Sequence, residues 1–221
     1  MKNYYDVLII GAGITGSMIA RELSRYDLKV AILDKENDVG NVTTNANSAI
    51  IHSGYDPKPG TLKAKFNVLG NKMYDKIAEE LDVPFYRIGS LTVALNDEQV
   101  NKLNELKLRS EQNGVEVRLL SKDELIKLEP NINPNVKAAL FAPTAGVIDP
   151  FLLCVRAIEN AMDNGVDLFL NEKVININKE NDLFFVKTLN NEYKARVVIN
   201  AAGNYADTIT EMIEPIDWKL D

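Results

Sequence analysis

Three glycines near the amino terminus stand between an apolar run and a segment with helical spacing. Gly11, Gly13 and Gly16 follow residues 5–10, and the helical pattern begins at residue 14. In such a turn the first glycine permits a tight reversal, the second leaves room for a pyrophosphate and the third lets the helix approach the strand. The helix N–H groups and dipole favour the anion. The pattern predicts dinucleotide binding by Gly11, Ala12, Gly13, Ile14, Thr15 and Gly16.

A second apolar run, residues 28–33, ends at an acidic side chain. Asp34 lies about 20 residues beyond the glycines, where a carboxylate accepts a hydrogen bond from the 2′-hydroxyl of an adenosine ribose. The same carboxylate would repel a 2′-phosphate, which disfavours NADP, although Lys35 beside it weakens the repulsion. FAD and NAD both remain open on these residues. The alternative is a turn of the same shape that binds nothing.

The composition of the chain limits its partners. The 221 residues carry a net charge of −7, and 46% of them are hydrophobic and 26% charged, which is ordinary for a globular protein. This acidic balance, without a cluster of lysine and arginine, argues against nucleic acid and against anionic membrane surfaces. We therefore expect small molecules or proteins as partners, and we predict no metal site.

The amino-terminal residues and the single cysteine bear on the compartment. Asp6 interrupts the start of the chain, and the apolar run stops at Gly11, too short for a secretion signal or a membrane span. Cys154 is the only cysteine, which excludes an internal disulfide and fits a reducing compartment. We expect a cytoplasmic protein in which Cys154 is a small buried hydrophobe rather than a reactive thiol.

The periodicity of apolar residues predicts the elements that must position these side chains. Helices are predicted at 61–82, with Thr61 as the cap, and at 97–113, 122–128 and 150–164. Further strands are predicted at 48–51, 90–95, 115–120, 136–142, 166–170, 173–178, 183–189 and 192–200. This order indicates an α/β fold: a Rossmann-like FAD/NAD(P)-binding domain, residues 1–82 and 143–221, with an inserted mixed α/β lobe, residues 83–142.

Small residues close the last predicted strand. Asn200, Ala201, Ala202 and Gly203 stand between this strand and a final helix. Small side chains at the carboxyl end of a parallel strand let a ligand approach the backbone. An ordinary strand-to-helix turn explains the same residues equally well.

Several motifs in order resemble one family. The glycine turn, Asp34, the loop 43–48, and the segments 51–54, 142–150 and 200–203 look like those of the FAD-dependent oxidoreductases of the D-amino-acid-oxidase superfamily. The likeness is greatest to the branch with anaerobic glycerol-3-phosphate dehydrogenases and L-2-hydroxyglutarate dehydrogenases. It runs from Tyr5 to about Asp207. The resemblance implies FAD as the cofactor and oxidation of a small 2-hydroxy compound, first glycerol 3-phosphate and alternatively L-2-hydroxyglutarate.

The resemblance also implies roles for single residues. Thr43 and Thr44 would contribute hydroxyl groups near the phosphates, and Asn47 and Ser48 would approach the ribityl chain or the flavin. Val174 would contact the adenine through its backbone. The other implied cofactor contacts are Asp34, Lys35, Ala202 and Gly203. Each residue also has a purely local explanation as a loop, turn or core residue.

His52 is the only histidine of the chain. Oxidation of an alcohol needs a base that takes the hydroxyl proton, and imidazole titrates in the suitable range. The alternative is a histidine at a strand end that only satisfies a backbone hydrogen bond. The resemblance favours the base, so His52 is the candidate catalytic residue.

Members of the family continue well beyond the segment 200–203. The resemblance therefore implies that these 221 residues correspond to the amino-terminal portion of such an enzyme, and that the inserted lobe is a partial mixed α/β substrate lobe. Whether they turn over alone stays open, and a truncated, non-catalytic nucleotide-binding fragment or subunit that needs a partner to complete its site is the alternative. The electron acceptor would be a protein or a membrane-associated molecule.

Overall fold

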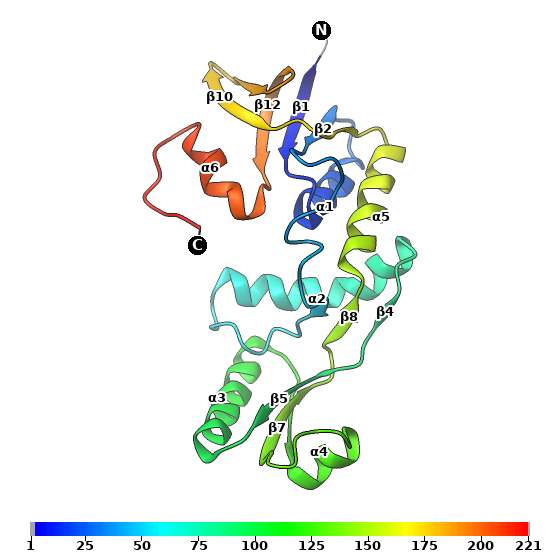
Figure 1. Cartoon of the computed structure of the whole chain (residues 1–221), viewed down its shortest axis with the longest axis vertical. Coiled ribbons are helices and arrows are strands. Elements are labelled where there is room, and N and C mark those ends of the chain that lie inside the picture. The colour runs from blue at the N-terminus through cyan, green and yellow to red at the C-terminus, as the bar shows by residue number, and fades with distance from the viewer. Residues whose placement is uncertain (1–2, 221) are drawn as a thin grey trace. The chain divides into compact units, whose positions relative to one another are not determined.

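The computed structural model describes residues 3–220, which fold into two compact units (Figure 1). The first unit contains the described residues of Met1–Ser48 and Pro150–Asp221, and the second unit is Ala49–Asp149. The sequence predicted the boundaries after residues 82 and 142 instead. Strand β3, Ile50–Ile51, pairs with β8, Gly146–Ile148, and helix α2, Leu62–Glu80, contacts α3, Asp97–Asn113. These contacts place residues 49–82 and 143–149 in the second unit.

A six-stranded sheet forms the first unit, in the order β10, β11, β12, β1, β2, β9. Strands β12, β1, β2 and β9 run parallel, whereas β10 and β11 are antiparallel to their neighbours. Ile10 is in register with both Leu33 and Asn200, so the carboxyl ends of three neighbouring strands meet at one edge. The predicted α/β class is confirmed. The strands are β1 Tyr4–Ile10, β2 Val30–Leu33, β9 Asp167–Phe169, β10 Val174–Glu180, β11 Leu183–Thr188 and β12 Glu192–Asn200.

Alternation along β1 sends its side chains into two separate cores. Leu8 and Ile10 pack with Tyr193, whereas Ile9 packs against the helices α1, Ile14–Leu23, and α5, Pro150–Asp163. Leu8 and Ile9 are both 0% exposed. Complete burial of such a side chain contributes about 1.5–3 kcal/mol. The strand that leads into Gly11 is therefore held on both faces.

The second unit contains two three-stranded sheets, in the orders β3, β8, β4 and β5, β7, β6. The helices α3 and α4 occupy the predicted residues because each begins with a strong local cap. Asn96 accepts a hydrogen bond from Gln99 N, and Ser121 and Glu124 form a reciprocal capping box. The remaining elements are β4 Phe85–Tyr86, β5 Ser90–Ala94, β6 Arg118–Ser121, α4 Lys122–Leu128 and β7 Ala138–Ala142.

Helix α2 is predicted by apolar spacing, but it buries other residues. Thr61 caps the helix, as predicted, by accepting a hydrogen bond from Ala64 N. Two apolar residues of the predictive pattern, Leu62 and Phe66, are 71% and 59% exposed. The buried positions of the helix are Ala64, Asn71 and Ala78. The spacing thus identified the helix and not the face that packs.

The last elements of the described chain are short. A 3₁₀ turn, Gly203–Tyr205, leads from β12 into α6, Ala206–Glu211. Strands β4 and β8 were not predicted, because each has only two or three residues and is defined by pairing with distant segments. Within residues 3–220, every helix is too short or too polar to cross a membrane.

Candidate functional site

A cavity of about 640 Å³ lies in the first unit, at the carboxyl ends of β12, β1 and β2. This volume is in the range of small-molecule and cofactor sites. Its position outside the carboxyl ends of parallel strands is where open α/β sheets hold their ligands. Its lining comes from five segments, within residues 10–15, 33–36, 40–47, 172–174 and 201–212.

Each glycine of the first turn has a separate structural reason. Gly11 has a φ of +107°, and a Cβ there would overlap the carbonyl of Ala201. A Cβ on Gly16 would overlap the carbonyl oxygen of Gly11, so the helix lies directly on the strand end. A Cβ on Gly13 would meet only Thr44 Oγ1, at 3.2 Å. Gly11 and Gly16 are therefore required for packing, whereas Gly13 leaves space in the cavity because it has no side chain.

The loop after β2 folds over the start of α1. Ile14 N donates a hydrogen bond to Thr44 Oγ1 over 3.0 Å, and Gly40 N donates to Ala12 O over 3.0 Å. Asn47 Nδ2 donates to the backbone oxygens of Thr43 and Thr44 over 3.2 and 2.7 Å. Gly13, the N-cap residue of α1, has no side chain to cap it, so the Thr44 hydroxyl takes that role.

Asp34 is fixed at the edge of the cavity by two backbone amides. Its Oδ2 accepts from Ala12 N over 2.6 Å, and its Oδ1 accepts from Glu36 N over 2.9 Å. Glu172 N donates to Asp34 O over 2.8 Å, which ties the segment before β10 to the same point. An ionised carboxylate has about four lone-pair sites, so two remain for a ligand hydroxyl.

The ammonium group of Lys35 contacts two neighbouring side chains of the same unit. Its Nζ lies 3.5 Å from the centroid of the Tyr205 ring and 3.6 Å from Glu36 Oε1. Both Lys35 and Tyr205 line the cavity. A partly exposed ion pair is worth about 0.2–1 kcal/mol, and an exposed cation–π contact about 0.5–1 kcal/mol. The Lys35 charge is therefore partly committed, and it offsets less of the repulsion between Asp34 and a 2′-phosphate.

Most of the predicted cofactor residues line this one cavity. They are Gly11, Gly13, Ile14, Thr15, Asp34, Lys35, Thr43, Thr44, Asn47, Val174, Ala202 and Gly203. Ala12, Gly16 and Ser48 are not part of the lining: Ala12 is buried beneath the turn, and Gly16 packs against Gly11.

Several further residues line the cavity that no sequence motif predicted. They include Glu36, Glu172, Tyr205, Thr208, Ile209 and Met212. Thr208, Ile209 and Met212 come from α6 and the residue after it, whose side chains form no recognisable motif. The last turn and helix could have been suspected only because they follow Ala202 and Gly203.

Cys154 is buried, as predicted, beneath the glycine turn. Its Sγ lies 3.4 Å from Ser17 Oγ and 3.5 Å from Ala12 O. Burial raises the pKa of the Cys154 thiol. The group stays protonated near neutral pH and packs as a small hydrophobe.

His52 belongs to the second unit, directly after β3. Its side chain is exposed, and its backbone oxygen accepts a hydrogen bond from Asn71 Nδ2 over 3.0 Å. Within residues 3–220 the imidazole itself makes no hydrogen bond, so the ring does not serve to satisfy a backbone group there. The next residue, Ser53, is 3% exposed, and its hydroxyl has no hydrogen-bond partner within the same residues.

Comparison with known proteins links the chain to one family. The profile of the DAO family, described as FAD dependent oxidoreductase, matches residues 6–219. The match covers both compact units.

Relatives with assigned activities are oxidoreductases of the same kind. A glycerol 3-phosphate dehydrogenase of Caloramator mitchellensis is 50% identical over 95% of this chain and 44% of its own length. An L-2-hydroxyglutarate dehydrogenase of Indibacter alkaliphilus is 35% identical over 98% of this chain and 55% of its own. The chain thus spans about half the length of the relatives that it matches.

A solved structure resembles the whole described chain. It is the dithionite-reduced L-alpha-glycerophosphate oxidase of Mycoplasma pneumoniae with FAD bound, at 35% identity and a TM-score of 0.92. The likeness covers 98% of this chain and 58% of that protein.

Proposed function

The chain belongs to the DAO family of FAD dependent oxidoreductases, and on this premise we propose that it serves the FAD-dependent oxidation of a small 2-hydroxy compound. The first choice of substrate is glycerol 3-phosphate, which would be oxidised to dihydroxyacetone phosphate. The observation that carries this choice is the 50% identity with a glycerol 3-phosphate dehydrogenase over 95% of the chain.

The cavity of the first unit fits the adenosine and pyrophosphate parts of FAD. Gly13 leaves space in the cavity because it has no side chain, and the adjoining amino-terminal end of α1 presents the positive end of its dipole to the phosphates. Asp34 keeps free lone pairs for the ribose hydroxyls. In the proposal Thr43, Thr44 and Asn47 lie along the phosphates and ribityl chain, and the Val174 backbone contacts the adenine. Bound FAD supplies the site that accepts a hydride from the alcohol carbon.

His52 is the residue that we propose as the base. A neutral imidazole nitrogen takes the proton from the substrate hydroxyl while the hydride leaves the carbon, so both parts of the oxidation are accounted for. The exposed and unbonded state of the imidazole supports this role, because the ring has no competing structural partner within residues 3–220.

L-2-hydroxyglutarate is the second candidate substrate. It is favoured by the 35% identity with the Indibacter enzyme, which extends over 98% of the chain. The chemistry at the oxidised carbon is the same, so the choice depends on the group beside it: a phosphate ester in one case and carboxylates in the other.

The experiment starts from the purified 221-residue chain loaded with FAD. We expect flavin absorption in the visible spectrum that survives gel filtration. Anaerobic addition of glycerol 3-phosphate should bleach these bands faster than L-2-hydroxyglutarate does. The assay is repeated on an extended chain, in which residues 1–221 are joined to the carboxyl-terminal remainder of the Caloramator enzyme. Flavin that is bound but reduced by neither compound in either chain would contradict the proposal.

We also propose a cytoplasmic location and a protein or membrane-associated electron acceptor. The single buried cysteine supports a reducing compartment. A partner that completes the site is the alternative to turnover by the chain alone. The two forms of the assay separate these alternatives, since bleaching in the extended chain only would require the added segment.

A further inference from the structure

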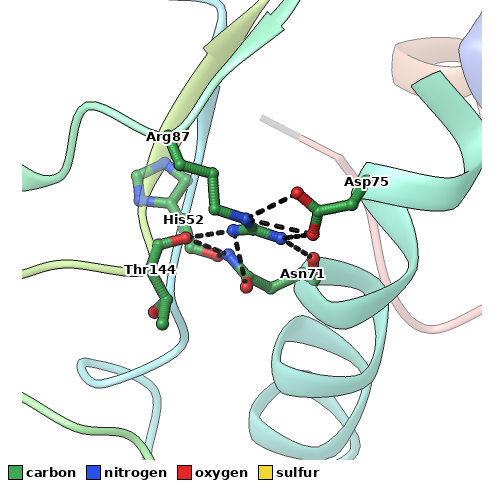
Figure 2. Close-up of polar contacts among 5 residues, drawn as sticks. All are labelled: His52, Asn71, Asp75, Arg87 and Thr144. Atoms are coloured by element: carbon green, nitrogen blue, oxygen red, sulfur yellow. Dashed lines mark hydrogen bonds and ion pairs between the residues drawn. The ribbon is translucent and has the colours of Figure 1, made fainter. Parts of the chain in front are cut away.

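One buried amide side chain joins the His52 segment to a second loop of the same unit. Asn71 lies on α2 and is 6% exposed. Its Nδ2 donates to His52 O over 3.0 Å and to Thr144 O over 2.9 Å (Figure 2). An amide NH₂ carries two donors, so both are used. The main chain at His52 is thereby fixed to the turn that precedes β8.

Arg87 determines how this amide is oriented. Its Nη1 donates to Asn71 Oδ1 over 3.1 Å, and its Nη2 donates to Asn71 O over 2.8 Å. Since a guanidinium only donates hydrogen bonds, the amide oxygen of Asn71 must face it, and the NH₂ group must face the two carbonyls. Arg87 Nη1 also donates to Thr144 O, so the same arginine holds Asn71 and one of the two carbonyls that Asn71 binds.

Asp75 holds Arg87 in place from the next turn of α2. Arg87 Nε donates to Asp75 Oδ1 over 3.0 Å, and Nη2 donates to Oδ2 over 2.5 Å, which is a bidentate pair (Figure 2). The hydrogen bond from Arg87 lowers the pKa of Asp75. Asp75, Arg87 and Asn71 therefore form a chain of contacts that ends at the backbone of His52.

The segment after His52 is held against the same helix. Gly54 has a φ of +94°, and a Cβ there would lie 2.7 Å from Val68 Cγ2 of α2. Ser53 between them is buried. Because the imidazole makes no hydrogen bond within residues 3–220, the main chain that carries it is what fixes its place among these residues.

We propose that Asn71, oriented by Arg87, is a positioning residue that fixes the main chain at His52 and thereby places its imidazole. The inference rests on the proposed function, in which His52 is the base. A base must lie within hydrogen-bond reach of the proton that it takes, so a small displacement of its backbone costs rate.

The test compares two substitutions with the same chemistry. Asn71→Asp keeps an oxygen toward Arg87 but removes both donors to His52 O and Thr144 O. Asn113→Asp is the matched control, because Asn113 Nδ2 donates to Gly54 O and Pro57 O over 3.1 and 2.9 Å. The control removes an equivalent pair of hydrogen bonds from the segment that follows His52, but none from His52 itself.

The only histidine of the chain provides the readout, since its imidazole gives one unambiguous set of NMR signals. In Asn71→Asp we expect these signals to shift and to broaden or split, whereas Asn113→Asp leaves them near the wild-type positions. Both variants should lose thermal stability, so stability does not separate them. Unchanged signals in Asn71→Asp, or equal changes in both variants, would overturn the proposal.

Arg87→Lys covers the case in which Asn71→Asp does not fold. The lysine keeps the charge beside Asp75, but its three N–H groups leave one atom and cannot reproduce the planar fork by which Arg87 contacts Asp75, Asn71 and Thr144 at once. We expect a smaller displacement of the His52 signals in the same direction, and wild-type signals in this variant would also contradict the role of Arg87.

Kinetics separates this inference from the proposed function. In the flavin-reduction assay Asn71→Asp should slow reduction by about 10-fold to 100-fold with little change in the substrate concentration at half-maximal rate. A His52→Ala variant with an unimpaired rate of flavin reduction would refute the role of His52 as the base. It would also refute a catalytic role for the hydrogen bond from Asn71 to His52. Unmoved His52 signals together with an impaired His52→Ala variant would refute only the positioning role.

Discussion

The carboxylate of Asp34 and the amide of Ala12 are joined by a hydrogen bond of 2.6 Å, which ties the acid after β2 to the turn after β1. A second bond, from Glu36 N to the other oxygen, prevents the carboxylate from rotating away. The side chain that would hold the ribose is thus oriented before any ligand arrives, and its position does not depend on the ligand.

Nucleotide choice should follow from this fixed charge. We expect the chain to retain FAD in preference to NAD because its family is FAD dependent. We expect it to reject NADP because Asp34 repels a 2′-phosphate and Lys35 is shared with Glu36 and Tyr205. Equilibrium dialysis against the three nucleotides measures this order. The Asp34→Asn substitution should reduce the difference in affinity between NAD and NADP. Preferential retention of NADP by the unmodified chain would refute the assignment.

The second glycine of the turn should be required for the ligand and not for the fold. Gly13→Val should abolish FAD binding while the domain stays folded, since the new side chain enters the cavity and its Cβ meets only Thr44 Oγ1. Gly11→Ala is the contrasting variant and should impair folding, because its Cβ would overlap Ala201 at a φ of +107°. Titration with FAD and circular dichroism measure the two effects. A Gly13→Val chain that binds FAD normally would show that the turn is only structural.

Thr44 should contribute to stability as a helix cap. Thr44→Val removes the acceptor of Ile14 N and should lower the free energy of unfolding by about 1 kcal/mol. Thr43→Val is the control, because Thr43 is exposed and its side chain takes no part in the cap. Urea unfolding of both variants gives the comparison, and equal losses would indicate that the Thr44 hydroxyl is not the cap.

The ion pair between Arg87 and Asp75 should make the stability of the folded chain depend on pH. Arg87 lowers the pKa of Asp75, so the pair stabilises the folded chain above the usual aspartate pKa of about 3.9 and loses this contribution as the pH falls through the lower folded value. Because Asp75 is largely exposed, the contribution is within about 0.2–1 kcal/mol. The difference in unfolding free energy between wild type and Asp75→Asn should therefore shrink from neutral pH to about pH 3. A difference that is constant over this range would refute the linkage.

Local signals explain how much of the fold was predictable. The ends of α3 and α4 follow from Asn96, Gly114 and the capping box of Ser121 with Glu124, all of which act within a few residues. The glycine turn and Asp34 were predictable for the same reason, since strand, turn, helix and acid stand in fixed order along the sequence. The boundary of the second unit was not, because it depends on pairing between β3 and β8, which lie far apart in the chain.

The link at His52 shows why part of the site stayed hidden. Asn71 lies outside the apolar pattern that predicts α2, and its two acceptors are 19 and 73 residues away in the sequence. Arg87 follows the unpredicted strand β4 and reaches back to α2. The Lys35 contact with Tyr205 is likewise formed only when two distant strand ends meet. Polar side chains of this kind have no local pattern, so only the folded chain identifies them.

The role of His52 can be decided in the extended chain loaded with FAD. His52→Ala should lower the rate of flavin reduction by about 10²–10⁴-fold, the usual loss when a general base is removed. Because the imidazole is exposed and makes no hydrogen bond within residues 3–220, the substitution should leave thermal stability and FAD affinity close to wild type. Stopped-flow reduction with glycerol 3-phosphate and with L-2-hydroxyglutarate measures the rate for both candidate substrates.

His52→Gln serves as the control, since an amide keeps polar contacts but does not take a proton near neutral pH. If the glutamine variant is as slow as the alanine variant, proton transfer is the function that was lost. A rate restored by glutamine would instead assign His52 to substrate orientation, because hydrogen bonding alone would then be sufficient.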